Sequence, residues 1–285
     1  MNPACCTGAK PETEPPLLSL SETEFMQLVA FVRDRYGINL EKKRELVISR
    51  LSFHIHSRGY RSYGEYLREV TSNPDGDECQ RMIDRLSTNH TYFFREMECL
   101  KHFIGKALPQ LVREGTNPVR IWCAAASSGQ ECYTIAMEMK AALSFCSPST
   151  NFTILATDVN SEVLAAGERG VYPEKELANI PERHRRLYTK SAGSGRFEIA
   201  ESLRRHVVWD HRNLMDPFSF PYGFDAVFCR NVMFYFKPET REALVPKFCA
   251  VLKPGGCFYV GVTESVDRHR RYFSYIAPSI YRKAG

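Results

Sequence analysis

The sequence predicts an α/β protein in which a mostly parallel sheet is covered by helices on both faces, preceded by a small all-α domain. From Val119 onward, short apolar segments typical of strands alternate with helical segments, as in a doubly wound, Rossmann-like fold. The first strand, Ile121 to Cys123, leads into a turn of very small residues and a helix that opens near Glu131. Small residues let the backbone approach a ligand closely, and the helix start offers unpaired N–H groups. The fold therefore carries a candidate ligand site at its first turn.

Composition narrows the class of protein. The 285 residues carry a formal net charge of +5, which is too mild to require a nucleic-acid partner. The ten cysteines are scattered without a CxxC pair, which favours reduced thiols in a cytoplasmic protein. No apolar run approaches about 18 residues, so we expect no direct membrane insertion. None of the eight histidines lies in a ligand-like cluster, so no metal site is predicted.

The chain is expected to divide into four parts. Residues 1–18 are polar, lack the apolar core of a signal peptide and are predicted to be a disordered tail. The all-α domain is expected at 19–88 and the α/β domain at 99–285, with a connecting helix at 89–98 that contributes to the site.

Four helices are predicted in the all-α domain. Ser21 and Glu24 form a capping box, which starts the first helix, and Gly37 is suited to end it. Apolar residues at helical spacing place the other helices at about 40–57, 63–70 and 77–86.

The second of these helices has one basic side. Against two glutamates, its polar residues include the cations or potential cations Lys42, Lys43, Arg44, Arg50, His54 and Arg58. Such a face is often simply solvated. It could also dock an acidic partner, such as a helix rich in glutamate.

Residues 87–96 join the two domains and combine hydrogen-bonding side chains, three aromatic residues and an Arg–Glu pair. An amphipathic connecting helix, capped at Thr88 or Asn89, is expected here. Because polar residues lie beside an aromatic run just before the ligand-binding domain, the segment could also close over a pocket.

The α/β domain is built from the alternation described above. Strands are expected at 119–123, 152–156, 224–229 and 257–261, and helices at 132–143, about 160–168 and 238–252. An insert at about 189–212 interrupts this pattern, with Gly193 and Gly195 marking a turn. Its segments 196–200 and 206–212 are expected to form two short antiparallel strands.

The residues around the first turn indicate the chemistry of the ligand. The turn carries one glycine where a dinucleotide fingerprint has three, and Glu131 would repel a pyrophosphate but attract a cation. Asp158 ends the second strand, where an acid can accept hydrogen bonds from ribose hydroxyls or can cap the next helix. S-adenosylmethionine contains ribose, adenine, an ammonium and a sulfonium but no phosphate. It suits this site better than NAD or ATP, so a Rossmann-like S-adenosylmethionine-binding fold is predicted.

Four collinear segments carry a resemblance to a known family. They are 88–96 (TNHTYFFRE), 122–131 (WCAAASSGQE), 156–158 (ATD) and 224–236 (FDAVFCRNVMFYF). With the small helical domain in front, the chain resembles the CheR family of chemotaxis receptor glutamate methyltransferases from about Ser21 to its C-terminus. Four long motifs in order make this resemblance specific. It implies that the fold is a Rossmann-like S-adenosylmethionine-dependent methyltransferase fold.

The resemblance implies roles for individual residues. Asn89, Thr91 and Arg95 would contact the methionine part of the cofactor, Glu131 its ammonium and Asp158 its ribose. Asn213 and Leu214 would flank the adenine, and Arg230 and Asn231 would line the pocket. Arg95 and Tyr235 would assist at the methyl-transfer centre, where a glutamate carboxylate becomes a methyl ester and S-adenosylhomocysteine is released. No metal is implied.

The resemblance also implies partners. The acceptor would be the cytoplasmic helical bundle of membrane chemoreceptors, with the enzyme recruited to receptor clusters. Docking would use the basic residues Lys42, Lys43, Arg44, Arg50 and Arg58. Some members bind a receptor C-terminal peptide through a G-x-G-x-x-x-G turn, but this chain has Ile199 in place of the third glycine. We therefore expect it to work independently of such a tether.

Two other functions remain open at this point. A methyltransferase could act on RNA or a small molecule, although the mild charge and the lack of an aromatic–basic stripe weigh against RNA. A non-enzymatic signalling scaffold that senses S-adenosylmethionine is the second alternative. The presence of Arg95, Arg230 and Tyr235 weighs against it.

Overall fold

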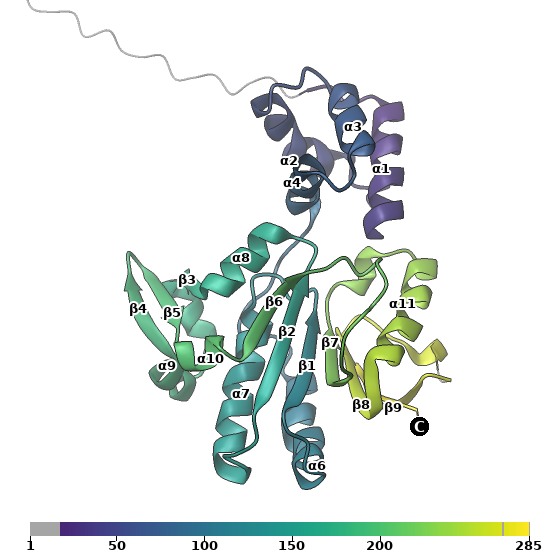
Figure 1. Ribbon diagram of the computed structural model, residues 1–285. Helices are drawn as coiled ribbons and strands as arrows, with labels where there is room; N and C mark the ends of the chain where they lie inside the picture. Colours follow the sequence, from purple (N-terminus) through teal and green to yellow (C-terminus); the bar gives the residue numbers. More distant parts are fainter. Residues whose placement is uncertain (1–17, 270, 285) are drawn as a thin grey trace, which may run out of the picture. The chain divides into compact units, whose positions relative to one another are not determined.

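The computed structural model describes residues 18–269 and 271–284, which form two compact units (Figure 1). The first unit contains the described residues up to Ala30 together with Leu40–Leu86. The second contains Phe31–Asn39 and the described residues from Ser87 onward. The predicted disordered tail falls, except for Leu18, outside the described residues.

The helices of the N-terminal part are close to those predicted. They are α1 (Glu22–Tyr36), α2 (Arg44–Ser57), α3 (Tyr63–Ser72) and α4 (Asp77–Leu86). The capping box of α1 is confirmed, because Glu24 Oε2 accepts from the Ser21 N–H at 2.8 Å and the Ser21 hydroxyl at 2.6 Å. The Glu24 N–H in turn donates to Ser21 Oγ at 3.3 Å.

The basic side of α2 differs from the prediction in two respects. The helix begins at Arg44, so Lys42 and Lys43 precede it. His54 is buried rather than solvated, with its Nε2 2.6 Å from Glu78 Oε1. This pairing joins residues 24 positions apart, which helical periodicity alone does not reveal.

The three arginines of this face have partners within the first unit. Arg44 contacts the Glu22 carboxylate and the Leu20 carbonyl, and Arg58 Nε donates to Glu78 Oε2 at 3.1 Å. Arg50 donates to the carbonyls of Arg85 and Leu86. Lys42, by contrast, is exposed.

In the second unit, a mixed sheet forms the centre (Figure 1). Within the described residues it has seven strands in the order β6-β2-β1-β7-β8-β10-β9. Their bounds are β1 Val119–Ala124, β2 Phe152–Asp158, β6 Val207–His211, β7 Phe224–Cys229, β8 Leu252–Val260, β9 Phe273–Ala277 and β10 Ile280–Lys283. The pairs from β6 to β8 are parallel, whereas β10 runs antiparallel to β8 and β9.

Helices precede the first strand of this sheet and fill the connections between later strands. They are α5 (Glu98–His102), the π-helix η1 (Phe103–Ala107), α6 (Leu108–Arg113), α7 (Gln130–Cys146), α8 (Ser161–Arg169) and α11 (Pro238–Val251). Short 3₁₀ segments are η2 (Glu174–Asn179), η3 (Met233–Tyr235) and η4 (Asp267–His269). No helix in the described ranges is long and apolar enough to cross a membrane.

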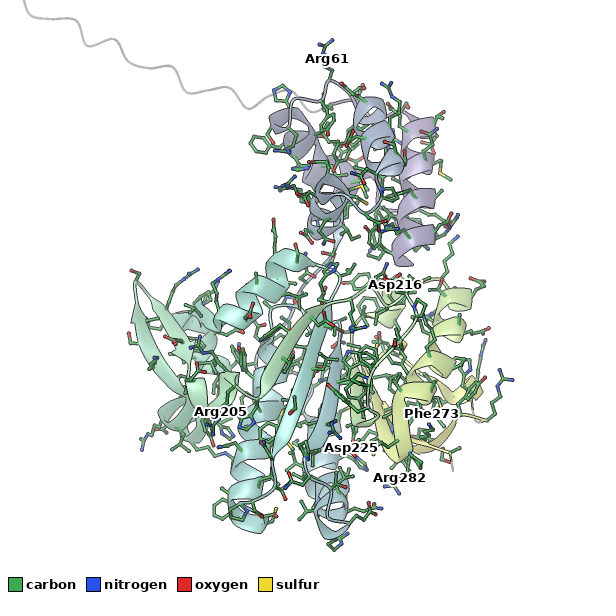
Figure 2. All side chains as sticks on the ribbon, viewed as in Figure 1. Arg61, Arg205, Asp216, Asp225, Phe273 and Arg282 are labelled. Carbon is green, nitrogen blue, oxygen red and sulfur yellow. The ribbon has the colours of Figure 1, made fainter. Side chains whose placement is uncertain are left out.

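Both faces of the sheet are buried, as predicted. Along β1, Ile121 and Cys123 join a core that includes residues of α5 to α7, whereas Trp122 and Ala124 join a second core that includes residues of α11. This alternation with a period of two follows from the pleat of a strand. At the start of β7, the buried Asp225 (labelled in Figure 2) accepts the Arg120 N–H at 2.8 Å and pairs with Lys253. It therefore fixes the end of the sheet opposite the carboxyl edge.

The insert is an antiparallel sheet, and of the two strands predicted for it only 196–200 is confirmed, as β5. It consists of β3 (Val171–Pro173), β4 (Thr189–Gly193) and β5 (Arg196–Ile199) in the order β3-β5-β4, beside α9 (Glu182–Tyr188) and α10 (Glu201–Arg204). The prediction that 206–212 pairs within the insert is wrong, because β6 pairs in parallel with β2 at the edge of the main sheet. Figure 1 shows β6 beside β2.

The connecting segment is also different from the prediction. Residues 88–97 contain no helix, and α5 starts only at Glu98. Phe94 and Glu96 have positive φ values of 59° and 46°, which a helix does not allow. The reason is tertiary, since the Phe94 N–H donates to Thr134 Oγ1 of α7 at 3.1 Å.

Acidification should destabilise the first unit through His54. Burial lowers the pKa of His54 despite its hydrogen bond to Glu78, so the unfolded chain binds a proton at this residue more readily than the folded one. Stability should therefore fall as the pH drops below about 6.5, the ordinary value for histidine. Burial raises the pKa of Glu78, but His54 and Arg58 outweigh it and hold that pKa low. Glu78 thus adds a second loss below about pH 4.5.

Amide exchange in α2 at pH 7 and pH 5.5 measures this effect. His54→Gln keeps a donor for Glu78 but does not titrate, so its loss of protection should be smaller than that of the wild type. His56→Gln, exposed on the same helix, is the matched control and should behave like the wild type. Equal losses in all three proteins would contradict the account.

Gly129 should be required by the turn before α7. Its φ is +88°, and an added Cβ would lie 2.4 Å from Trp209 Cη2. Gly129→Ala should cost about 1–2 kcal/mol for the left-handed backbone, and more for the clash. Gly115 has φ +74° and open space around it, so Gly115→Ala measures the cost of the left-handed backbone without a clash. Denaturant unfolding followed by fluorescence should show a larger loss for Gly129→Ala; equal losses would exclude the steric part.

Candidate active site

The candidate site lies at the carboxyl edge of the main sheet, where the strand order changes direction. The chain moves outward from β1 through β2 to β6 and then continues with β7 on the other side of β1. Ala124 at the end of β1 is paired with Cys229 at the end of β7, so the loops after these strands start side by side. Doubly wound sheets bind their ligands at such a switch point.

The turn after β1 has an unusual backbone. Three alternate residues have positive φ, namely Ala125 (64°), Ser127 (50°) and Gly129 (88°). The end of β2 holds this shape, because the Thr157 carbonyl accepts the Ala126 N–H and Asp158 Oδ2 accepts the Ser127 N–H, both at 2.8 Å. The turn predicted to bind the ligand is thus fixed by hydrogen bonds to the neighbouring strand.

Asp158 is the last residue of β2, where it was predicted, and its side chain is buried. Burial raises its pKa, while hydrogen bonds from the N–H groups of Asn160 and Ser127 act in the opposite direction. The alternative role as N-cap of α8 is wrong, because Asn160 is the N-cap and accepts the Val163 N–H at 3.1 Å. A carboxylate has about four acceptor positions, so Asp158 retains capacity for a ligand.

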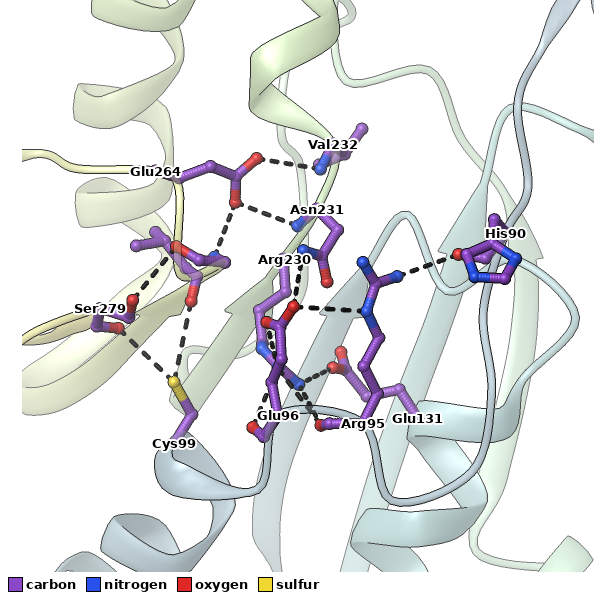
Figure 3. Close-up of polar contacts among 12 residues, drawn as sticks. His90, Arg95, Glu96, Cys99, Glu131, Arg230, Asn231, Val232, Glu264 and Ser279 are labelled. Atoms are coloured by element: carbon purple, nitrogen blue, oxygen red, sulfur yellow. Dashed lines mark hydrogen bonds and ion pairs between the residues drawn. The ribbon is translucent and has the colours of Figure 1, made fainter. Parts of the chain in front are cut away.

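Arg230, directly after β7, is the most buried cation of the site. Its side chain is 4% exposed and forms ion pairs with two carboxylates, those of Glu96 and Glu131 (Figure 3). It also donates to the carbonyl of Glu96 at 3.0 Å and approaches that of Arg95. Burial acts to lower the pKa of Arg230, but the two carboxylates raise it above its ordinary value. Arg230 is therefore a fixed, neutralised charge.

Glu131 pairs with Arg230 and could also pair with a ligand cation. It lies in the first turn of α7, as predicted, and its Oε2 contacts Arg230. Its side chain remains 24% exposed, which leaves the carboxylate accessible to a ligand cation. An ammonium would share Glu131 with Arg230.

Arg95 is held more loosely than Arg230. Its guanidinium donates to the His90 carbonyl at 3.0 Å and its Nε lies 3.4 Å from Glu96 Oε1 (Figure 3). It also lies over the Tyr92 ring, 5.5 Å from the centroid. Its Nε has no hydrogen-bond partner of good geometry in the described structure, and the side chain is 22% exposed. Arg95 thus keeps donors for an anion, although it also pairs with Glu96.

Aromatic contacts hold the backbone around Arg95. Phe93 is buried against Tyr172 of β3, with 5.0 Å between ring centroids, and Phe94 stacks on the buried His184 of α9 at 5.5 Å. Phe94 and Glu96, on either side of Arg95, have positive φ values. Such strained residues persist only where surrounding contacts hold them in place, and they cluster at functional sites. The insert therefore supports the segment that carries Arg95.

Asn89 lies beside the turn after β1. Its carbonyl accepts the Ser127 hydroxyl at 3.0 Å, and its Nδ2 donates to Ser87 Oγ at 3.1 Å. Ser87 Oγ also accepts Asn160 Nδ2 at 2.7 Å, which ties the segment to the start of α8. Thr91 follows Asn89 and is half-buried.

The remaining predicted residues lie at the same edge or next to it. The Arg212 N–H donates to the Asp158 carbonyl at 3.0 Å, which places Asn213 and Leu214 next to the end of β2. The Asn213 side chain has structural partners, since Nδ2 donates to the Arg35 carbonyl at 2.7 Å and Oδ1 accepts the Met215 N–H at 3.0 Å. Leu214 is buried. An adenine would therefore contact this pair mainly through backbone and apolar atoms.

Asn231 and Tyr235 lie on the loop after β7. Asn231 has φ +58°, and its Nδ2 lies 3.4 Å from Glu96 Oε1. Tyr235 ends η3, and its carbonyl accepts the Asn39 N–H at 2.9 Å. The contacts of Asn231 join this loop to the Arg95–Glu96 segment.

The charged residues around the turn suit a cationic ligand that carries no phosphate. The carboxylates of Glu131 and Asp158 border the turn after β1, and the nearby cation Arg230 is already neutralised. A phosphate would meet two carboxylates and no unpaired strong cation at the turn. In the described ranges, no group of three or more His, Cys, Asp or Glu side chains could hold a metal.

The sequence did not reveal three contributors to this edge. Glu96 was considered only as a partner of Arg95, yet it also pairs with Arg230. Ser127 bridges Asp158 and Asn89. Glu264, in the loop after β8, accepts N–H groups of the loop that carries Asn231. Glu264 could have been suspected from the sequence, because it follows shortly after a predicted strand of the sheet, where site residues tend to lie.

Comparisons with known proteins identify the family of the chain. Residues 89–281 match the domain family described as CheR methyltransferase, SAM binding domain, and residues 23–87 match the CheR methyltransferase, all-alpha domain. A chemotaxis protein methyltransferase of Borreliella burgdorferi is 36% identical over 272 residues, covering 93% of this chain and 96% of the relative. The Escherichia coli protein of the same description is 33% identical, covering 93% and 92%.

Among solved structures, the glycopeptide N-methyltransferase MtfA complexed with S-adenosyl-L-methionine is 16% identical, with a TM-score of 0.32. The match covers 61% of this chain and 58% of MtfA, and a likeness this weak adds nothing to the assignment. The two domain families and the curated relatives carry it. The chain belongs to the CheR methyltransferase family, and its α/β domain binds S-adenosylmethionine to serve as a methyl-transfer domain.

Proposed function

We propose that this enzyme methylates glutamate side chains in the cytoplasmic helical bundle of chemoreceptors, giving glutamate methyl esters and S-adenosylhomocysteine. The relatives are described as chemotaxis protein methyltransferases, which supports this acceptor class. The observation that carries the proposal is the pair of unequal arginines. Arg230 is buried between two carboxylates, whereas Arg95 is partly exposed with donors to spare. One guanidinium organises the site and the other can receive an acidic acceptor.

The reaction requires alignment more than acid–base chemistry. A glutamate side chain has a pKa of about 4.3, so it is already a nucleophilic carboxylate at neutral pH. When bound, S-adenosylmethionine supplies an electrophilic methyl group on its sulfonium. Arg95 can hold the acceptor carboxylate by paired hydrogen bonds, and the Tyr235 hydroxyl can donate to its second oxygen. These contacts would fix a near-attack geometry at about 3 Å and displace water.

The other residues of the site would hold the cofactor. Glu131 would receive the ammonium and Asp158 the ribose, while Asn213 and Leu214 would flank the adenine. Asn89, Thr91, Arg95 and Asn231 would border the methionine part. Arg230 would act indirectly, by orienting Glu131 and Glu96.

Docking to the receptor would rely on the basic residues of the first unit. Lys42 is exposed, so we assign it the largest share of docking. Lys43 is half-buried, and Arg44, Arg50 and Arg58 have intramolecular partners, so these four would contribute less. The proposed setting is the cytoplasmic side of the membrane, at receptor clusters.

We also propose that docking does not need a receptor C-terminal peptide. Gly193 and Gly195 form the β4–β5 turn, but Ile199 takes the place of a third glycine and is fully buried in the core of the second unit. A buried isoleucine at this position supports the insert rather than a peptide.

Arg95→Ala should reduce kcat for methylation of a receptor cytoplasmic fragment by about 10²-fold or more, because the acceptor loses its paired donors. Cofactor affinity, measured by calorimetry, should change far less. Arg95→Lys should recover only part of the rate, since an ammonium cannot pair with both oxygens in the same way. Arg113→Ala, at an exposed site on α6, is the control. Near-normal turnover of Arg95→Ala would refute its role.

Lys42→Glu combined with Lys43→Glu should lower kcat/KM for the intact receptor fragment about tenfold at low salt and flatten its salt dependence, because long-range attraction to acidic helices is lost. Lys101→Glu with Lys106→Glu makes the same change of net charge at exposed positions of the second unit. That control should have a much smaller effect. If both pairs behave alike, the basic residues before α2 are only solvated.

A further inference from the structure

We propose that Glu264 is a positioning residue, whose carboxylate holds the Asn231–Tyr235 loop in the conformation that methyl transfer requires. This inference rests on the proposed function for the role of Tyr235. It goes beyond that function by assigning the loop a fixed internal anchor.

The anchor is a carboxylate that accepts four backbone N–H groups. Glu264 Oε2 accepts from Gly261 at 2.6 Å and from Asn231 at 3.0 Å. Glu264 Oε1 accepts from Val232 at 3.0 Å and from Phe234 at 3.3 Å. Figure 3 shows Glu264 reaching from one loop to the backbone of the other. Three of the four donors belong to the loop between β7 and Tyr235.

The loop needs this anchor because its backbone is strained. Asn231 has φ +58°, which costs free energy for a residue other than glycine unless the surroundings hold it. Successive N–H groups around a left-handed residue point to one side and form a nest for an anion. Glu264 is 7% exposed and supplies that anion from within the protein.

The loop that carries Glu264 is itself firmly placed. Gly261 follows β8, and its carbonyl accepts the Ser279 hydroxyl at 3.1 Å and the Glu264 N–H at 2.9 Å. An added Cβ at Gly261 would lie 2.8 Å from Glu264 Oε2 and 2.9 Å from the Asn231 nitrogen. The two loops therefore touch at a point where only glycine fits.

A glutamine cannot replace Glu264. Each carboxylate oxygen accepts two N–H groups, so either orientation of an amide places its NH₂ against two other donors. Glu264→Gln removes the anchor with almost no change of volume. Asn231, which borders Glu96, and Tyr235 would then lose their fixed position.

The test combines amide exchange with kinetics on the full chain. In Glu264→Gln, exchange in peptides covering 230–236 should become faster, and kcat for the receptor fragment should fall about 10²-fold, as expected for a misplacement of about 1 Å. The affinity for S-adenosylmethionine should fall less than kcat, because Asn231 is the proposed cofactor contact on this loop, whereas Glu131 and Asp158 lie on other elements. Glu242→Gln, at an exposed carboxylate of α11, is the matched control and should leave all three quantities unchanged.

A double-mutant cycle with Tyr235→Phe separates positioning from general stability. If Glu264 acts through the loop of Tyr235, Glu264→Gln should have a much smaller effect on kcat in the Tyr235→Phe protein than in the wild type. If the factors by which the two single substitutions lower kcat simply multiply in the double variant, the two residues act independently and the proposal is overturned. Gly261→Ala perturbs the same contact from the other loop and should reproduce the exchange and kcat changes, so the test stands even if Glu264→Gln folds poorly.

Exchange and kcat measured on the same variants test the anchor and its role in the reaction separately. Unchanged exchange at 230–236 would show that Glu264 is not the anchor, and faster exchange with normal kcat would show that the anchor does not serve the reaction. If the wild type itself fails to methylate receptor glutamates, the proposed function falls, and the positioning role falls with it. That failure appears in the wild type, whereas failure of the anchor appears only in the variants.

Discussion

The site is organised around one buried charge, the guanidinium of Arg230. A cation with 4% exposure is stable only if its lost hydration is largely replaced, and at the two terminal nitrogens the carboxylates of Glu96 and Glu131 together with main-chain carbonyls replace it. These partners come from the connecting segment and from α7, so a single desolvated charge ties both to the end of β7. Removal of either carboxylate would leave a buried charge half-paired, which is a far larger penalty than the loss of a surface ion pair.

Strain and its compensation are concentrated at the same edge. Positive φ values occur at Phe94 and Glu96 in the connecting segment, at Ala125 and Ser127 in the first turn, and at Asn231 after β7. Each of these segments is held by a long-range contact, to Thr134, Asp158 or Glu264. The loops that would bind cofactor and acceptor are therefore held rigidly at the carboxyl edge of the sheet, which suits a reaction whose main requirement is alignment.

Sequence patterns predicted the parts of this structure that local chemistry determines. The capping box of α1, the strand of β7 and the N-cap region of α8 depend on neighbours within a few residues. The connecting helix was wrong because a contact to Thr134 of α7 outweighs the local preference. The strand at 207–211 was found but its partner was wrong, since a short edge strand has the same pattern in a hairpin or a parallel sheet. The Glu131–Arg230 pair spans 99 positions, and no local pattern encodes it.

The most direct test of the central claim is the chemistry of the transferred methyl group. The full-length enzyme is incubated with methyl-labelled S-adenosylmethionine and a receptor cytoplasmic fragment, and the product is treated with mild base. The account predicts that the label resides on glutamate side chains and is released as methanol, as expected for a carboxyl methyl ester. A label that is stable to base, or that is found on an acceptor other than glutamate, would contradict it.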